Sequence, residues 1–206
     1  MDPAAPIPTA LELLDYFGIA VFAVSGALLA AEKRQTLVTF IFFAVVTGVG
    51  GGTLRDLLIG APVFWVHTNW TLLICIGAAL AVWTTRRRRF AGQALLWFDA
   101  AGLAAYATYG AAKALGYAVA PVPAFAMGVL TACVGGIIRD LLAGEPSILM
   151  RPELYVTAAA LAAGLFVGLI LLGVSGALAA AIAVVAGFAL RGLAIARGWS
   201  LPAYRD

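Results

Sequence analysis

The chain has 206 residues, of which 64% are hydrophobic and 11% are charged, and its formal net charge is +3. In a soluble globular domain about a quarter of the residues are charged. The mean hydropathy of +1.02 also argues against a soluble domain. A soluble fold could not cover this much apolar surface. The composition therefore excludes a soluble domain and predicts one compact, all-α integral membrane protein.

Seven apolar segments have the length that crosses a bilayer, roughly 17 to 25 residues. The connections between them are short, and none is long enough for a soluble domain. The first segment has no basic stretch before it, so we do not expect a cleaved signal peptide. We expect a single membrane domain over 1–206 with transmembrane helices at 13–31, 37–59, 69–85, 94–115, 122–143, 154–172 and 175–196.

Basic residues outside the membrane set the expected orientation, because cytoplasmic connections carry an excess of Lys and Arg. The run 86–89 lies between two membrane helices, so we interpret it as a topology anchor that favours anionic lipid and not as a nucleic-acid site. The expected orientation has the N-terminus outside and the C-terminus in the cytoplasm. It leaves the outer connections without basic residues and places ten on the cytoplasmic side: Lys33, Arg34, Arg86, Arg87, Arg88, Arg89, Arg151, Arg191, Arg197 and Arg205.

The cysteine and histidine content gives no sign of a metal centre or an enzyme. Cys75 and Cys133 both lie in apolar segments, which favours free buried thiols over a disulfide or a metal site. His67 is the only histidine and lies in a polar break. The sequence also has no Ser-His-Asp set and no phosphate loop after a strand, so we expect no catalytic activity.

The sequence repeats itself at an offset of 84 residues. Over residues 13–62, 18 of 50 positions are identical to their mates without a gap. The matches include the motif Arg-Asp-Leu-Leu at 55–58 and at 139–142. Each copy holds three spans, so the second copy enters the membrane from the opposite side. We therefore predict two inverted three-helix repeats, at 13–85 and 94–172, with a seventh helix at 175–196 that has no mate.

Clustered glycines distinguish the second span and its mate, the fifth. Glycine in a helix interior costs about 1 kcal/mol relative to alanine and allows the helix to bend or unwind. Freed carbonyls could replace the water around a cation. The alternative is close packing of helices at small residues. We favour a pore-lining bend for five of these glycines: Gly50, Gly51, Gly52, Gly135 and Gly136.

Charges inside membrane spans are costly and usually face a partner or a water-filled cavity. Arg55 and Asp15 have similar expected depths near one side of the membrane, and Arg139 and Asp99 near the other. We therefore predict two symmetric ion pairs, Asp15 with Arg55 and Asp99 with Arg139, in which removal of one partner strands a charge.

Three further charges are less symmetric in their expected roles. Asp56 and Asp140 follow the two arginines directly and point about 100° away from them on a helix, so they cap, pair elsewhere or face water. Lys113 has Leu29 as its mate, so it breaks the symmetry. It either snorkels to the outer surface or acts as a barrier or gate in a cation path. Polar side chains near mid-depth that could line such a path are Ser25, Thr47, Tyr109 and Thr131, although each could also bond its own helix.

The two glycine–Arg-Asp stretches, GGGTLRDLLIGAP and GGIIRDLLAGEP, together with a seventh helix, make the chain similar to prokaryotic members of the trimeric intracellular cation (TRIC) channel family. The resemblance covers about residues 12–197. It implies a multi-pass protein of the bacterial inner membrane, a homotrimer with a pore in each protomer, and passage of K⁺ or Na⁺. No cofactor is implied beyond the permeant ion and bound membrane lipid. Lys113 matches a basic residue linked to gating in the family.

Two points depart from that resemblance or compete with it. The animal members carry Lys-Glu-Val on the second helix, tied to inositol-lipid binding, whereas this chain has Leu54-Arg55-Asp56. The same sequence domain is also associated with glycine transport in bacteria. Inverted repeats and broken helices are common in secondary transporters, so a carrier of a small zwitterion such as glycine stays the alternative to a channel.

Overall fold

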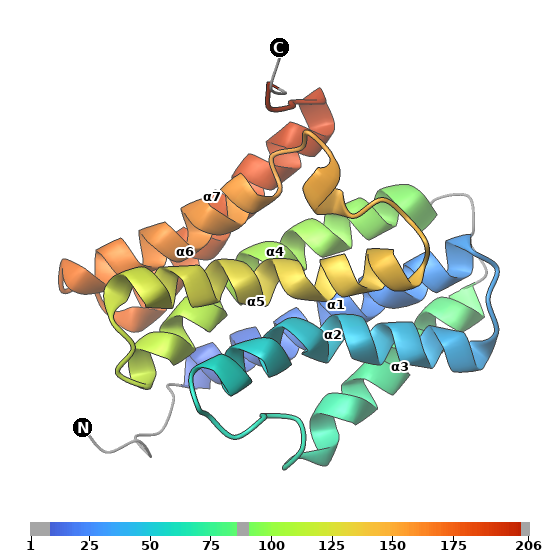
Figure 1. The fold of residues 1–206 in the computed structure, drawn as a ribbon, viewed down its shortest axis with the longest axis horizontal. Coiled ribbons are helices and arrows are strands. Elements are labelled where there is room, and N and C mark those ends of the chain that lie inside the picture. Colours follow the sequence, from blue (N-terminus) through green and yellow to red (C-terminus); the bar gives the residue numbers. More distant parts are fainter. Residues whose placement is uncertain (1–8, 86–90, 203–206) are drawn as a thin grey trace.

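The computed structural model describes residues 9–85 and 91–202. In these ranges the chain is built from α-helices joined by short connections, as Figure 1 shows. The seven expected helices are confirmed, with ends that differ from expectation by at most four residues. They are α1 (Thr9–Glu32), α2 (Leu37–Leu58), α3 (Asn69–Thr85), α4 (Ala91–Gly116), α5 (Pro121–Leu142), α6 (Val156–Leu171) and α7 (Gly176–Arg197), and a 3-10 helix, η2 (Ile148–Met150), precedes α6.

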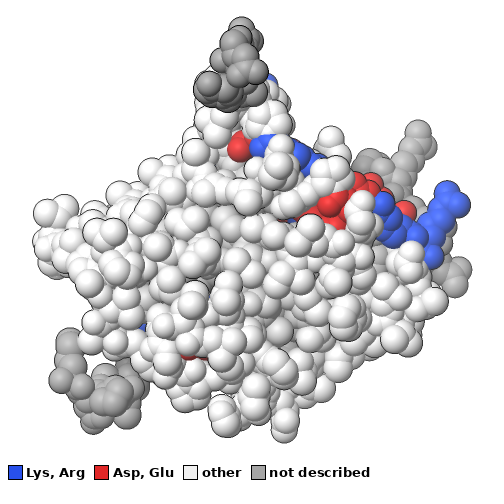
Figure 2. Space-filling model, in the orientation of Figure 1, with Lys and Arg blue, Asp and Glu red and all other residues white. Residues whose placement is uncertain are grey.

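Several of these helices have the length and apolarity of membrane spans. Within the described residues, α1, α2, α5 and α7 each contain 22 residues that meet both criteria. The apolar helices α3 and α6 are shorter, with 17 and 16 residues. Figure 2 shows a broad uncharged surface with the charged side chains gathered toward one end. These features identify a membrane protein. Arg86 to Arg89 and Arg205, which contributed to the expected orientation, lie outside the described residues.

The two motif helices, α2 and α5, end in the same way. Gly60 and Gly144 follow their last turns, each with φ of 68°, a left-handed conformation that residues with a Cβ rarely adopt. Beyond each glycine, a backbone N–H turns back to the helix: Ala61 donates to the Asp56 carbonyl at 2.8 Å, and Glu145 donates to the Asp140 carbonyl at 3.0 Å. This termination satisfies carbonyls of the last turn, and it directs both connections back over the Arg-Asp motifs.

The helices are arranged in two similar halves. In one half α3 packs on α1 and α2, and in the other half α6 packs on α4 and α5. Across the centre, α1 lies against α4 and α2 against α5, and the members of each pair run in opposite directions (Figure 1). Helix α7 packs mainly on α4 and α6, with a small contact to α1, and so belongs to the second half. The arrangement is that of two inverted three-helix repeats completed by a seventh helix.

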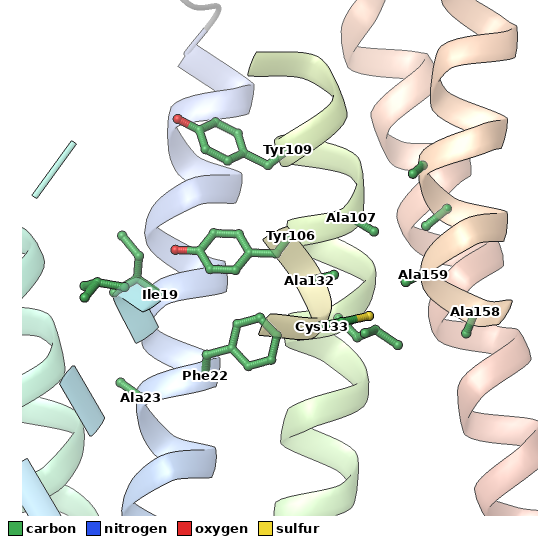
Figure 3. Close-up of a cluster of buried hydrophobic side chains, with 14 of the residues drawn as sticks. Ile19, Phe22, Ala23, Tyr106, Ala107, Tyr109, Ala132, Cys133, Ala158 and Ala159 are labelled. Atoms are coloured by element: carbon green, nitrogen blue, oxygen red, sulfur yellow. The ribbon is translucent and has the colours of Figure 1, made fainter. Parts of the chain in front are cut away.

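A pair of aromatic mates marks the centre of the molecule. Phe22 of α1 and Tyr106 of α4 are 84 residues apart, and their ring centroids lie 5.3 Å from each other. Each ring packs over a glycine of the opposite helix, because a Cβ at Gly18 would lie 2.8 Å from Tyr106 and one at Gly102 would lie 2.9 Å from Phe22. Figure 3 shows these rings between the two helices. The glycines therefore permit the close α1–α4 contact, as expected for small residues.

Candidate functional site

A first cluster of charges lies where α2 ends, and we call this the Arg55 end. The Arg55 side chain is 1% exposed, and its Nη2 lies 2.8 Å from Oδ1 of Asp56. Lys113, which comes from α4, lies 2.8 Å from the same carboxylate oxygen. One buried aspartate therefore pairs with two cations from different repeats, so removal of either cation leaves the carboxylate with a partner.

Aromatic rings enclose the cations at the Arg55 end. The Arg55 guanidinium lies 5.2 Å from the ring centroid of Tyr109 and 5.8 Å from that of Phe64. The Lys113 ammonium lies 5.6 Å from the Phe64 ring. Phe64 is held in place because its backbone N–H donates to Oδ2 of Asp56 at 3.0 Å. The faces of aromatic rings attract cations. These rings therefore stabilise the positive charges of Arg55 and Lys113 on the sides that the Asp56 carboxylate does not contact.

A second cluster lies where α5 ends, at the opposite end of the bundle (Figure 1), and we call this the Arg139 end. Arg139 is also 1% exposed. Its Nη1 donates to Asp99 of α4 at 2.5 Å and to the hydroxyl of Ser25 of α1 at 3.0 Å, and its Nη2 lies 2.9 Å from Asp140. The predicted pair of Asp99 with Arg139 is confirmed. Here one arginine serves two carboxylates, the reverse of the arrangement at the other end.

The two clusters share contacts that follow the sequence repeat. Asp140 accepts the backbone N–H of Ile148 at 3.0 Å, as Asp56 accepts that of Phe64, and these are mate positions. Each arginine also meets the other repeat at mate positions, Arg139 at Ser25 and Arg55 at Tyr109. The symmetry of the repeat therefore extends to individual side-chain contacts. At each end of the site, the opposite half contributes a side chain that contacts the arginine.

The predicted pair of Asp15 with Arg55 is wrong. Asp15 forms no ion pair with Arg55 within the described part of the chain, and its buried Oδ1 has no hydrogen-bond partner there, because Arg55 turns to Asp56 instead. Asp56 pairs elsewhere, with Lys113, which was one of the expected alternatives. Asp56 and Asp140 each accept a backbone N–H from the connection that follows, and each also bonds to the preceding arginine, which was not expected.

Lys113 does not snorkel to the surface. Its side chain is 7% exposed, and its ammonium donates to Asp56 in the interior. The Asp56 carboxylate of α2 lies within reach of the ammonium and provides the partner that a buried charge needs. This contact joins the fourth helix to the motif of the second, which sequence spacing alone did not show.

The glycines of α2 and α5 form a tight crossing. A Cβ at Gly51 would collide with the Thr131 carbonyl of α5, and one at Gly135 would lie 2.5 Å from the Thr47 carbonyl of α2, again at mate positions. Both helices run without interruption through their glycines, so local unwinding is not seen there, and the pore-lining bend that we favoured stays a prediction. The packing interpretation accounts for Gly51 and Gly135.

The remaining glycines of the motif face side chains. A Cβ at Gly50 would lie 3.3 Å from the flexible end of Ile138. At Gly52 it would lie 2.7 Å from the Phe64 ring, and at Gly136 it would lie 2.8 Å from the Tyr155 hydroxyl. These two positions leave room for an aromatic residue of the following connection.

The expected polar candidates are all buried, and their side chains have different partners. Ser25 bonds to Arg139, and Tyr109 stacks near Arg55. The Thr131 hydroxyl donates back to its own helix, to the Met127 carbonyl at 2.5 Å. The Thr47 hydroxyl has no hydrogen-bond partner within the described residues. Ser25 and Tyr109 therefore belong to the charged clusters, whereas Thr131 stabilises its own helix.

Three residues of the site were not anticipated from the sequence. Phe64 and Tyr155 lie in connections, and no periodicity marks them. Arg191 was counted with the basic residues of the cytoplasmic side, but it is 1% exposed and pairs with Glu153 at 2.5 Å. Its position inside the apolar segment of α7 was the available signal, since a charge there needs a partner. Among the described residues no group of three His, Cys, Asp or Glu side chains could hold a metal ion.

Sequence comparison relates the chain to a family of membrane proteins. The family model described as glycine transporter matches residues 12–87 and 96–170. A UPF0126 membrane protein of Vibrio cholerae is 47% identical over 151 residues, which is 72% of this chain and 63% of the relative, so this match leaves over a third of the relative uncovered. The inner membrane protein YadS of Escherichia coli K12 is 41% identical over 70% of this chain and 72% of its own length.

Structure comparison relates the chain to channels. The TRIC trimeric intracellular cation channel orthologue from Rhodobacter sphaeroides is 43% identical, covers 93% of this chain and all of its own, and superposes with a TM-score of 0.88. A prokaryotic TRIC channel in 0.5 M KCl is 27% identical over 95% of this chain, with a TM-score of 0.87. These relatives are membrane proteins and channels, not enzymes. By its sequence and its fold, the chain belongs to the prokaryotic TRIC channel family.

Proposed function

We propose that the protein is a channel for monovalent cations, K⁺ and Na⁺, with a pore in each protomer. The observation that carries the proposal is the likeness to the solved cation channel from Rhodobacter sphaeroides, at 43% identity over 93% of the chain. The buried charge clusters support it, because ionisable residues inside a membrane protein usually mark an ion or substrate path. No resident cofactor is needed for passive conduction.

The proposed path runs along the crossing of α2 and α5. At its centre the glycines bring backbone carbonyls of Thr47 and Thr131 to the surface of the opposite helix. Bending of α2 and α5 at these glycines would open the crossing and present carbonyls to a cation. In the conformation described, the two helices are in contact, so we assign it to a closed channel.

The two ends of the path differ in charge. At the Arg55 end, Asp15 and Asp56 balance Arg55 and Lys113, whereas at the Arg139 end, Asp99 and Asp140 exceed Arg139 by one negative charge. A cation is thus attracted at one end and meets a compensating lysine at the other. We propose Lys113 as the gate at the Arg55 end, held closed by Asp56.

Replacement of the proposed gate provides a direct prediction. Lys113→Gln removes a positive charge from the path, so we expect the cation current per channel or the open probability to rise about tenfold, the effect of 1.4 kcal/mol. Single-channel recording measures both quantities. Lys33→Gln is the matched control, because Lys33 pairs with Glu145 at the surface and not in the path. Equal currents for the wild type and Lys113→Gln would contradict this role.

Assembly and orientation are further parts of the proposal. We propose a homotrimer in the bacterial inner membrane, with the N-terminus outside, the C-terminus in the cytoplasm, and membrane lipids between protomers. Lys33, Arg34 and Arg151 all lie in connections at the Arg139 end, which we therefore place at the cytoplasm, as the bias of basic residues favours. Crosslinking of the purified protein in detergent should give a trimer.

A secondary transporter of a small zwitterion such as glycine is the second candidate. The description of the matching family model as glycine transporter favours it. A buried arginine and buried aspartates offer partners for a carboxylate and an ammonium group. In this view the two clusters bind substrate alternately from opposite sides.

Recording in planar bilayers separates the two functions. For a channel, purified protein should give discrete current steps in KCl, with a reversal potential near that of K⁺ in a salt gradient. For a carrier, bilayers should stay silent while liposomes show saturable glycine counterflow. Silent bilayers together with saturable glycine counterflow would overturn the proposal that the protein is a channel.

A further inference from the structure

An aromatic residue fills the space above the second glycine of the motif at each end. Phe64 occupies that space above Gly52, and Tyr155 occupies it above Gly136. The two glycines are mates in the repeat, but the aromatic residues are not, since they follow their glycines by 12 and 19 residues. The two ends are therefore filled by side chains of different origin, held by different contacts.

Tyr155 lies directly on the charged cluster of the Arg139 end. Its side chain is fully buried, and its hydroxyl has no hydrogen-bond partner within the described residues. A Cβ added to Gly136 would lie 2.8 Å from the Tyr155 hydroxyl, 3.5 Å from Asp99 and 3.6 Å from Arg139. The hydroxyl and the two charged groups therefore surround the same glycine. Burial of an unpaired hydroxyl is unfavourable, so other contacts hold the side chain in this place.

Helix α7 supplies those contacts. The Arg191 guanidinium lies 5.5 Å from the centroid of the Tyr155 ring, and its Nη2 donates to Glu153 at 2.5 Å. Glu153 precedes Tyr155 by two residues, and its carbonyl accepts the Tyr155 N–H at 2.8 Å. Arg191 thus contacts both the Tyr155 ring and Glu153, which belongs to the same backbone segment as Tyr155.

The residues after α7 hold the same connection. The N–H of Leu201 donates to the Pro152 carbonyl at 2.7 Å, and Ser200 forms a β-bridge with Glu153. Helix α7 has no mate in the first half, so the Arg55 end has no equivalent of this attachment. The connection before α6 is therefore tied to the residues that follow α7, while within the described residues the Phe64 N–H donates to Asp56.

We propose that Arg191 is a latch that holds Tyr155 across the cation path at the Arg139 end, and that breaking the Arg191–Glu153 pair releases it. The proposal rests on the channel function proposed above. Arg191 acts through Tyr155 and is therefore a positioning residue, while Tyr155 is the obstructing group. The seventh helix thereby controls one end of a path that the two repeats build.

Single-channel recording tests the latch. Arg191→Met and Glu153→Gln should each raise the open probability roughly five- to tenfold, because each removes the charge-assisted hydrogen bond between Arg191 and Glu153. The unitary conductance should not change. Tyr155→Ala should have the same effect, and adding Arg191→Met to it should produce no further increase. Arg151→Met is the matched control, because Arg151 is an exposed cation of the same connection.

A thiol-labelling measurement keeps the latch testable if no current is seen. Cys133 is buried on α5, one turn before Gly136, so in a Cys75→Ala background it reports access to the Arg139 end. Its rate of maleimide labelling in detergent should rise several-fold in Arg191→Met, Glu153→Gln and Tyr155→Ala, but not in Arg151→Met. Glu153 is partly exposed, so its variant covers the case in which Arg191→Met fails to fold.

The possible outcomes separate the latch from the channel. Faster labelling in the three variants, together with silent wild-type bilayers and saturable glycine counterflow, would support the latch and reject the channel. Unchanged labelling in all three variants would overturn the latch, whether or not the protein conducts. Currents with unchanged open probability in the variants would also overturn it.

Discussion

Arg139→Met should destabilise the protein more than Arg55→Met. Loss of Arg139 strands both Asp99 and Asp140 in the interior, and breaking a buried ion pair costs about 3–5 kcal/mol. Loss of Arg55 leaves Asp56 paired with Lys113. We therefore expect a cost of about 1–3 kcal/mol, which is typical for a buried polar group that loses one hydrogen-bond partner. Thermal unfolding of the purified protein in detergent should show a drop on the order of 10 °C for Arg139→Met and a smaller one for Arg55→Met.

Neutralising the stranded partner provides the control for this prediction. In an Asp99→Asn background, Arg139→Met should cost less than it does alone, because one of the two abandoned carboxylates is gone. Arg151→Met, at an exposed position of the same end, should leave the unfolding temperature unchanged. Equal losses for Arg55→Met and Arg139→Met would show that Lys113 does not support Asp56 in the way the structure indicates.

Gly51→Ala and Gly135→Ala should each destabilise the crossing of α2 and α5. The added methyl group meets a backbone carbonyl of the opposite helix, Thr131 in one case and Thr47 in the other, and backbone cannot rotate away. Overpacking of this kind costs about 1–3 kcal/mol. Gly77→Ala on α3 is the matched control, since nothing lies within 4 Å of its added Cβ. Lower unfolding temperatures for the first two variants, but not for the third, would support the packing role.

Gly50→Ala separates packing from bending. Its added methyl group meets the flexible end of Ile138 at 3.3 Å and lies at ordinary contact distance, 3.8 Å, from the Cα of Gly135, so stability should change little. If α2 bends here during opening, the same change should lower the open probability, because alanine stiffens the helix. A variant with normal stability and normal conduction would argue against a hinge at this position.

Much of this protein was determined by its sequence. The apolar segments set the number of helices and their bounds, because a bilayer leaves few alternatives to a hydrogen-bonded helix. The offset of 84 residues indicated inverted halves, and the expected depth of the charges paired Asp99 with Arg139 correctly.

Only the tertiary structure decided which partner each charge takes. Depth along the helices placed Asp15 beside Arg55, but side chains of Arg and Asp reach several ångströms, so the adjacent Asp56 and the distant Lys113 formed the pairs instead. The same holds for Arg191, whose partners Glu153 and Tyr155 lie in a connection with no periodic signal. The length and apolarity of the segments determine which helices form. The choice among charges within reach depends on helix rotation and on the path of the connections, which are determined only when the bundle packs.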